Sequence, residues 1–226
     1  MAWLLLASGP GDPAFNMAMD EALLVSMPRL QTPVLRFYSW TIPAASFGYF
    51  QKYSEVERMT HLRPLVRRPT GGGLVPHDAD WTYSLAVPVS NGWYHLRAAD
   101  SYLRMHQWIK EAFDRAGIPT ELATVPRHSG PGQCFVGYEK SDVLYNGLKI
   151  AGAAQRRTRD GLLIQGSIQP GPIKLTRAEW EKNMVSAAMD FLEDFHRIFE
   201  PDNPLLEKVQ QLVQVKYSDT RFNQRR

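Results

Sequence analysis

The order of apolar segments along the chain constrains the fold more than any other feature of the sequence. Strand-like runs occur at residues 3–6, 34–38, 45–50, 65–68, 81–87 and 162–168. Helical spacing separates them at residues 15–26, with Pro28 as the stop, and at residues 98–117, where Gly117 and Pro119 mark the end. Strands interrupted by single helices predict an α+β fold, in which a mixed or antiparallel sheet packs against helices.

Short local signals place the remaining elements. Asn146-Gly147 lies between apolar runs at 142–145 and 148–151, which predicts a hairpin with a type I′ turn. Thr176 and Glu179 form a capping box, and we expect a long amphipathic helix from there to residue 198. Asn203-Pro204 begins a last helix. Since no linker-like stretch divides the chain, residues 1–226 are expected to form a single domain without an accessory domain.

Composition and charge exclude several classes of protein. The 226 residues are 44% hydrophobic and 22% charged, which is typical of a globular domain with a sizeable core. A net charge of +3 is too small for the electrostatic footprint of a nucleic-acid binder. One cysteine permits neither an internal disulfide nor a cysteine-rich zinc site, and the apolar run at residues 3–7 is too short to span a membrane. We therefore expect a cytoplasmic protein with no metal site and no nucleic-acid or membrane partner.

A glycine-rich segment is the first candidate site. It runs Arg67-Arg68-Pro69-Thr70-Gly71-Gly72-Gly73 and continues through Val75 to His77-Asp78. Three consecutive glycines are costly in entropy, but their exposed N–H groups can hold an anion, and arginines add charged donors. An anion-binding or acyl-binding role and a flexible turn between strands both remain open. The spacing matches neither the phosphate-loop nor the dinucleotide-binding pattern.

Two single side chains are further candidates. Lys149 follows the tight turn among small and apolar residues, so it could hold a carboxylate or carbonyl oxygen; the alternative is an exposed strand lysine. Cys134 follows the loop sequence Ser-Gly-Pro-Gly-Gln, which makes a reactive thiol a candidate; the alternative is a small buried apolar residue, the usual role of a lone cysteine. His77 or His128 could activate that thiol, although the sequence places neither of them.

These segments together resemble one family. Residues 16–23 (NMAMDEAL), 35–38 with 47–51, 67–78, 147–155 and 166–168 match, in order, the conserved blocks of lipoate–protein ligase A and the octanoyltransferases, which belong to the biotin/lipoate protein ligase superfamily. Residues 216–218 and the closing Asn223-x-x-Arg226 resemble the family's C-terminal signature. One departure is Gln165, where family members usually have His. The resemblance implies the catalytic-domain fold of class II biotin/lipoate ligases.

The resemblance also implies a set of site residues. Lys149 and Cys134 would be catalytic. The acyl or nucleotide group would be bound by Arg67, Arg68, Thr70, Gly71, Gly72, Gly73, Val75, His77, Asp78, Asp142, Gly147, Ala151, Gly152, Ala153 and Gly166.

Two chemistries are implied, and both modify a lysine on a lipoyl domain, such as that of a 2-oxoacid dehydrogenase E2 component or the glycine cleavage H protein. In the first, which we favour, Cys134 takes octanoate from acyl carrier protein as a thioester; the spacing of Cys134, Asp142 and Lys149 is that of the transferases. In the second, free lipoate is activated with ATP and Mg²⁺ as an adenylate. Gly73 favours this second chemistry, since transferases more often have Arg there. A catalytically silent lipoyl-binding homologue and a biotin ligase are weaker alternatives.

Overall fold

The computed structural model describes residues 3–127, 132, 135–188 and 195–225. Within this part of the chain, an eight-stranded sheet has the strand order β11-β1-β2-β6-β10-β9-β8-β7. Strand β1 pairs parallel with β2 and β11, and the pairs from β2 to β7 are antiparallel. The expected mixed sheet is therefore confirmed. Its strands are β1 (Trp3–Gly11), β2 (Val34–Trp40), β6 (Trp81–Pro88), β7 (Glu121–Leu122), β8 (Val143–Tyr145), β9 (Leu148–Thr158), β10 (Gly161–Ile168) and β11 (Phe195–Ile198).

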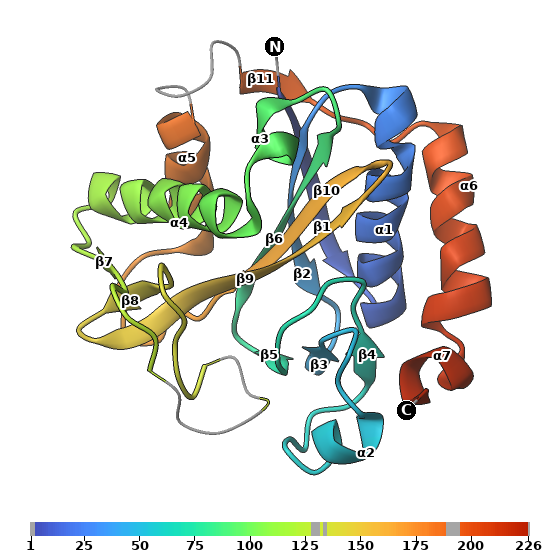
Figure 1. Cartoon of the computed structure of the whole chain (residues 1–226), viewed down its shortest axis with the longest axis horizontal. Coiled ribbons are helices and arrows are strands. Elements are labelled where there is room, and N and C mark those ends of the chain that lie inside the picture. Colours follow the sequence, from blue (N-terminus) through green and yellow to red (C-terminus); the bar gives the residue numbers. More distant parts are fainter. Residues whose placement is uncertain (1–2, 128–131, 133–134, 189–194, 226) are drawn as a thin grey trace.

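A second, smaller sheet carries the glycine-rich segment. In the described residues it has three strands in the order β4-β3-β5, with bounds Leu65–Arg67, Ala44–Phe47 and Val75–His77. Strand β3 pairs parallel with β4 and antiparallel with β5. The glycine-rich segment is thus the connection from β4 to β5, held at both ends by pairing to the same central strand (Figure 1).

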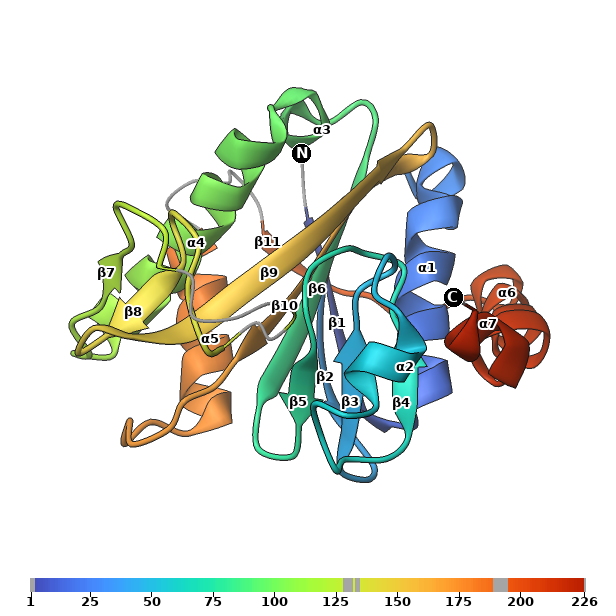
Figure 2. The ribbon, with the colours of Figure 1, turned by 60° about the horizontal axis from the view of Figure 1, so that its bottom comes forward.

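Helices cover both faces of the large sheet. Helix α1 (Pro13–Leu30) packs on β6 and β10 and is itself covered by α6 (Asn203–Leu212). On the opposite face, α4 (Ala98–Arg115) packs against β9 and against α5 (Arg177–Ala188). Figure 2 shows these two helix layers on either side of the sheet. The shorter elements are α2 (Tyr53–Val56), α3 (Gly92–His95), a π-helical turn (Val213–Tyr217) and α7 (Thr220–Gln224).

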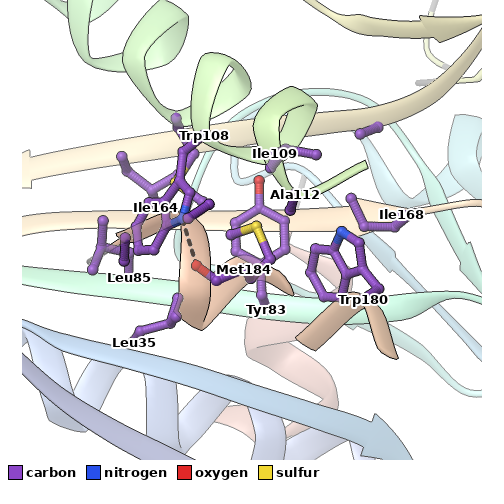
Figure 3. Packing of buried hydrophobic residues seen from close by; sticks show 14 of the residues in the cluster. Leu35, Tyr83, Leu85, Trp108, Ile109, Ala112, Ile164, Ile168, Trp180 and Met184 are labelled. Atoms are coloured by element: carbon purple, nitrogen blue, oxygen red, sulfur yellow. Dashed lines mark hydrogen bonds between the residues drawn. The ribbon is translucent and has the colours of Figure 1, made fainter. Parts of the chain in front are cut away.

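Because both faces of the central strands are covered, successive strand residues enter two different cores. Leu85 packs toward α4 and α5, whereas its neighbour Ala86 packs toward α1. In the core on the α4–α5 face, Trp108 donates a 2.7 Å hydrogen bond from Nε1 to the carbonyl oxygen of Met184, which ties the two helices together (Figure 3). Burial of these large side chains holds the strands in position, and the strand ends carry the polar residues.

The local predictions have mixed outcomes. The hairpin is confirmed: Asn146 and Gly147 have φ of 49° and 74°, as a type I′ turn requires. The capping box is confirmed by hydrogen bonds that Thr176 and Glu179 exchange. No helix in the described residues is long and apolar enough to cross a membrane.

Three expectations about helix ends were wrong. Helix α1 does not stop at Pro28 but continues to Leu30, because one missing N–H costs little where the last turn is anchored by the buried Met27. Residues 195–198 form strand β11, not the end of a helix; their spacing suits either structure, and the free edge of β1 supplies a hydrogen-bonding partner. The helix beginning at Asn203 is also not the last, since α7 follows it.

Candidate functional site

A cleft lies between the large sheet, the small sheet and α1. Its volume is about 40 Å³, taken as the space open to the centre of a water-sized sphere. The aromatic and aliphatic part of its lining comes from Met17, Tyr38, Trp40, Val75, Phe135, Ala153 and Ala154. The remaining lining consists of polar or small residues: Ser46, Arg68, His77, Thr82, Lys149, Gly152, Gln165, Gly166 and Ser167. Such a mixture suits a ligand with a long apolar part and one polar end.

Lys149 brings an ammonium group to this cleft. The residue is the second of β9, directly after the Asn146-Gly147 turn, and its side chain is only 7% exposed. Its Nζ lies 2.7 Å from Oδ2 of Asp142, whose side chain is fully buried. Nζ also lies 5.2 Å from the centre of the Phe135 ring, within the range of a cation–π contact. The lysine is therefore held in place and is not the freely exposed strand lysine of the alternative interpretation.

Gly152 makes room for that ammonium. A Cβ atom built on Gly152 would lie 2.5 Å from Cε and 2.7 Å from Nζ of Lys149. The lysine side chain therefore passes directly over the glycine backbone. Gly166 on the neighbouring strand is restricted in a similar way, because a Cβ there would lie 2.1 Å from Oη of Tyr83. Both glycines are required by close approach of a neighbouring side chain and not by an unusual φ.

The glycine-rich loop is held by Arg68. Its guanidinium donates to the carbonyl oxygens of Gly71 and Gly73 at 2.7 Å and to that of Ser46 at 3.2 Å. Gly72 has φ of 85°, and its carbonyl oxygen would lie 1.9 Å from a Cβ on Gly48, so the loop also lies tight against the end of β3. Charged hydrogen bonds thus close this loop into a defined shape, which argues against the alternative of a flexible turn between strands.

A polar network surrounds His77 on the floor of the cleft. Its Nδ1 lies 2.9 Å from Oδ2 of Asp80, and its Nε2 lies 2.7 Å from Oγ of Ser46. Oδ2 of Asp80 also accepts hydrogen bonds from the hydroxyls of Thr82 and Ser167. Because a carboxylate only accepts, Nδ1 of the ring donates to Asp80, which leaves Nε2 as the nitrogen that contacts Ser46. Trp40 stacks on the imidazole with ring centres 3.9 Å apart.

A second buried network joins the glycine-rich loop to α1. Asp20 of α1 forms a 2.7 Å ion pair with Arg36 of β2, and both side chains are fully buried. Gln165 donates from Nε2 to Asp20 at 2.7 Å and accepts at Oε1 from Thr70, also at 2.7 Å. The glycine-rich loop is therefore connected through one amide to a buried charge pair. Sequence reasoning missed this network, although Asp20 and Arg36 both stand in the blocks that carry the family resemblance.

The sequence-predicted residues divide into groups in the structure. Arg68, Val75, His77, Lys149, Gly152, Ala153 and Gly166 line the cleft, and Thr70 and Asp142 bond directly to residues that do. Gly71, Gly72 and Gly73 form the loop beside it, Gly147 lies in the hairpin turn, and Ala151 is buried in the core on the α4–α5 face. Asp78 is exposed, and Asp80 instead bonds to His77. Cys134 and His128 lie outside the described residues.

Arg67 does not line the cleft, and its contacts hold parts of the fold together. Its buried guanidinium donates to five backbone carbonyls, those of residues 49, 51, 222, 223 and 225. Three of these belong to the segment around α7, so Arg67 fastens that segment against β4.

The fold and the cleft define an α+β domain with a cleft lined partly by apolar and partly by polar or small residues. Residues 12–170 match the model of the lipoyl protein ligase A/B catalytic domain, and the chain belongs to that family.

Named relatives agree with this assignment, and solved structures share the fold. The chain is 36% identical over 180 residues to octanoyltransferase LipM of Halalkalibacterium halodurans and to that of Staphylococcus aureus. Each match covers 74% of this chain and 65% of the relative's length. A lipoate-protein ligase A bound with ATP superimposes with a TM-score of 0.83 at 19% identity, covering 99% of both chains. A bipartite lipoate protein ligase from Thermoplasma acidophilum gives 0.77 at 19% identity, covering 99% of this chain and 96% of that one.

Proposed function

We propose that the protein transfers an octanoyl or lipoyl group to a lysine of a lipoyl domain. The observation that carries this proposal is the ammonium of Lys149, held by Asp142 in a cleft with an apolar lining. An eight-carbon acyl chain fits such a lining, and the ammonium is placed to donate to the carbonyl oxygen at its polar end. Membership of the lipoyl protein ligase A/B family supports the same substrate class. We also propose that residues 1–226 act as one catalytic domain in the cytoplasm.

The mechanism we favour uses Cys134 as the nucleophile. The sulfur of Cys134 attacks the carbonyl carbon of an octanoyl thioester on acyl carrier protein, and the proton that the Cys134 thiol gives up goes to the carrier sulfur, which leaves as a thiol. The neutral amine of the acceptor lysine then attacks the enzyme thioester, forms the amide and passes one proton to the leaving sulfur of Cys134, which returns to the thiol. This exchange needs no ATP, because the thioester on the carrier protein and the thioester on Cys134 have nearly the same free energy. Lys149 donates to the oxyanion that develops in each step.

Residues that flank Cys134 in the chain support this mechanism. Gly132 accepts at its carbonyl oxygen from the backbone N–H of Leu74, next to the glycine-rich loop, at 2.7 Å. Phe135 lines the cleft beside Lys149. The partners we propose are acyl carrier protein as donor and a lipoyl domain as acceptor. The bipartite ligase of Thermoplasma acidophilum acts in a lipoylation system together with its E2 lipoyl domain.

An ATP-dependent ligase is the second candidate, and the ordered glycine-rich loop favours it, since such loops present N–H groups to phosphates. In that reaction the loop would hold the phosphate of an acyl-adenylate. Among the described residues, no group of three or more His, Cys, Asp or Glu side chains is placed to hold a metal ion. Any Mg²⁺ would arrive with the nucleotide.

The decisive experiment is mass spectrometry of the protein after incubation with octanoyl carrier protein, without ATP or Mg²⁺. The expected result is an octanoyl adduct that hydroxylamine removes and that Cys134→Ser does not form. Lys149→Ala should keep its fold and lose transfer to a lipoyl domain by a factor of about 10²–10³. A Cys134→Ala variant that still lipoylates the acceptor from free lipoate and ATP would establish the ligase. If the unmutated protein carries out neither reaction, the remaining interpretation is a catalytically silent lipoyl-binding homologue.

A further inference from the structure

Tyr102 reaches the buried Asp142 from a different layer of the fold. It lies on α4, the helix that packs over β9, and its hydroxyl donates to Oδ1 of Asp142. The function proposed above assigns no role to this tyrosine. Its position matters because Asp142 forms the ion pair with Lys149.

The two oxygens of Asp142 have different partners. Oδ2 accepts from Nζ of Lys149 and from the backbone N–H of Glu139, each at 2.7 Å. Oδ1 accepts from Tyr102. In the described residues, Tyr102 thus donates to the carboxylate oxygen other than the one that pairs with Lys149. A carboxylate bound on both oxygens cannot rotate without breaking a charge-assisted hydrogen bond.

The surroundings of Tyr102 keep its hydroxyl a donor. Burial, together with the nearby Asp142 charge, raises the pKa of Tyr102 well above its usual value. The ring of His106 lies beside that of Tyr102, with centres 4.2 Å apart, and its Nδ1 lies 2.9 Å from the Tyr102 carbonyl oxygen. Burial lowers the pKa of His106 to about 4, so the imidazole stays neutral and adds no charge near Lys149 at neutral pH. The backbone of Ala153, a cleft residue, also hydrogen-bonds to Tyr102.

We propose that Tyr102 is a positioning residue, which fixes the Asp142 carboxylate and thereby aims the Lys149 ammonium into the acyl cleft; this role rests on the proposed acyl transfer. Without the tyrosine hydroxyl, Oδ1 of Asp142 would be buried without a donor, which is costly. Of the groups that bond to Asp142, the Lys149 ammonium ends the most flexible side chain, so it is the donor that can shift once the tyrosine hydroxyl is lost. It would move to share both carboxylate oxygens and withdraw from the acyl carbonyl.

The first test compares Tyr102→Phe with the unmutated protein in octanoyl transfer to a lipoyl domain. The variant should lose about tenfold in kcat, because a hydrogen bond to a charged group is worth at least that factor. The KM for octanoyl carrier protein should stay within about twofold, since the lining of the cleft is unchanged. Tyr94→Phe is the matched control: it also removes one tyrosine hydroxyl, whose 3.0 Å bond goes to the carbonyl of Thr158 and not to the cleft. It should behave as the unmutated protein does.

A second test shows whether Tyr102 acts through Asp142. In an Asp142→Asn background, Tyr102→Phe should cost less than about twofold, because the carboxylate that it orients is gone. If the two substitutions instead multiply their single effects, Tyr102 does not act through Asp142 and the proposal is overturned.

A third test needs no enzymatic activity. Brief labelling with acetic anhydride at pH 8, followed by peptide mass spectrometry, reports how available the Lys149 amine is. Labelling of Lys149 should fall several-fold in Tyr102→Phe and stay unchanged in Tyr94→Phe. Unchanged labelling in Tyr102→Phe would refute the positioning role. If the unmutated protein transfers no octanoyl group yet the labelling shifts as expected, the proposed function fails while the positioning of Lys149 stands.

Discussion

Adding one methyl group at Gly152 should separate the position of Lys149 from the stability of the fold. The Cβ of Gly152→Ala would lie 2.5 Å from Cε of Lys149. Carbon atoms in contact need about 3.5 Å, so the end of the lysine side chain must move by about 1 Å. A displacement of that size at a reacting centre costs on the order of 10²-fold in rate. We therefore expect kcat/KM for octanoyl transfer to fall about a hundredfold.

Stability should change little in the same variant. The clashing atoms are the far end of a flexible side chain, and Asp142 keeps its donors from Tyr102 and Glu139. Alanine within a strand is also favoured over glycine by about 0.5–1 kcal/mol. The free energy of unfolding, measured with urea, should stay within about 1 kcal/mol of the unmutated value.

Gly92→Ala is the matched control, since a Cβ there meets nothing within 4 Å and the residue lies in α3, away from the cleft. It should alter neither rate nor stability. A Gly152→Ala protein that transfers octanoate within threefold of the unmutated rate would refute the reasoning. It would mean that the position of the Lys149 ammonium is not critical for transfer.

Three further outcomes are expected. Ala153→Leu should narrow the cleft and lower kcat/KM for octanoyl at least tenfold relative to butanoyl, as measured by competition between the two acyl carrier proteins. Arg67→Met should leave buried carbonyls without donors and lower the free energy of unfolding in urea by about 3 kcal/mol or more. His106 binds a proton less readily in the folded state, so stability should decline as pH falls from 6.5 to about 4. The total loss is roughly 3 kcal/mol, and a His106→Leu variant should lack this contribution.

The spacing of apolar residues predicted most of the helices and strands, because most segments show either helical or strand spacing and not both. The hairpin at Asn146-Gly147 and the start of α5 are fixed by local chemistry, so local signals find them. Residues 195–198 show the limit of this approach. Their strand exists because β1 offers a parallel partner nearly two hundred residues away, and no local pattern contains that information.

The site shows the same division. The spacing of the glycine-rich segment and the position of Lys149 after a tight turn are visible in the sequence, and the structure places both at the cleft. The sequence does not show that the two neighbouring arginines make different contacts. Arg68 closes the glycine-rich loop whereas Arg67 fastens the α7 segment, and neighbouring residues of one type separate in this way only because strand side chains alternate. Likewise, only the fold reveals that Asp80, and not Asp78, orients His77.

The amide of Gln165 links the glycine-rich loop to α1 with hydrogen-bonding groups that do not change with pH. One side-chain end donates to Asp20 while the other accepts from Thr70. An imidazole at this position, as the resembling family usually has, could fill both roles in only one tautomer. On protonation it would present a second donor, and the Thr70 hydroxyl would have to rotate and accept instead. Because an amide does not titrate, Gln165 keeps the same donor and the same acceptor in mildly acidic surroundings, so Thr70 need not reorient there.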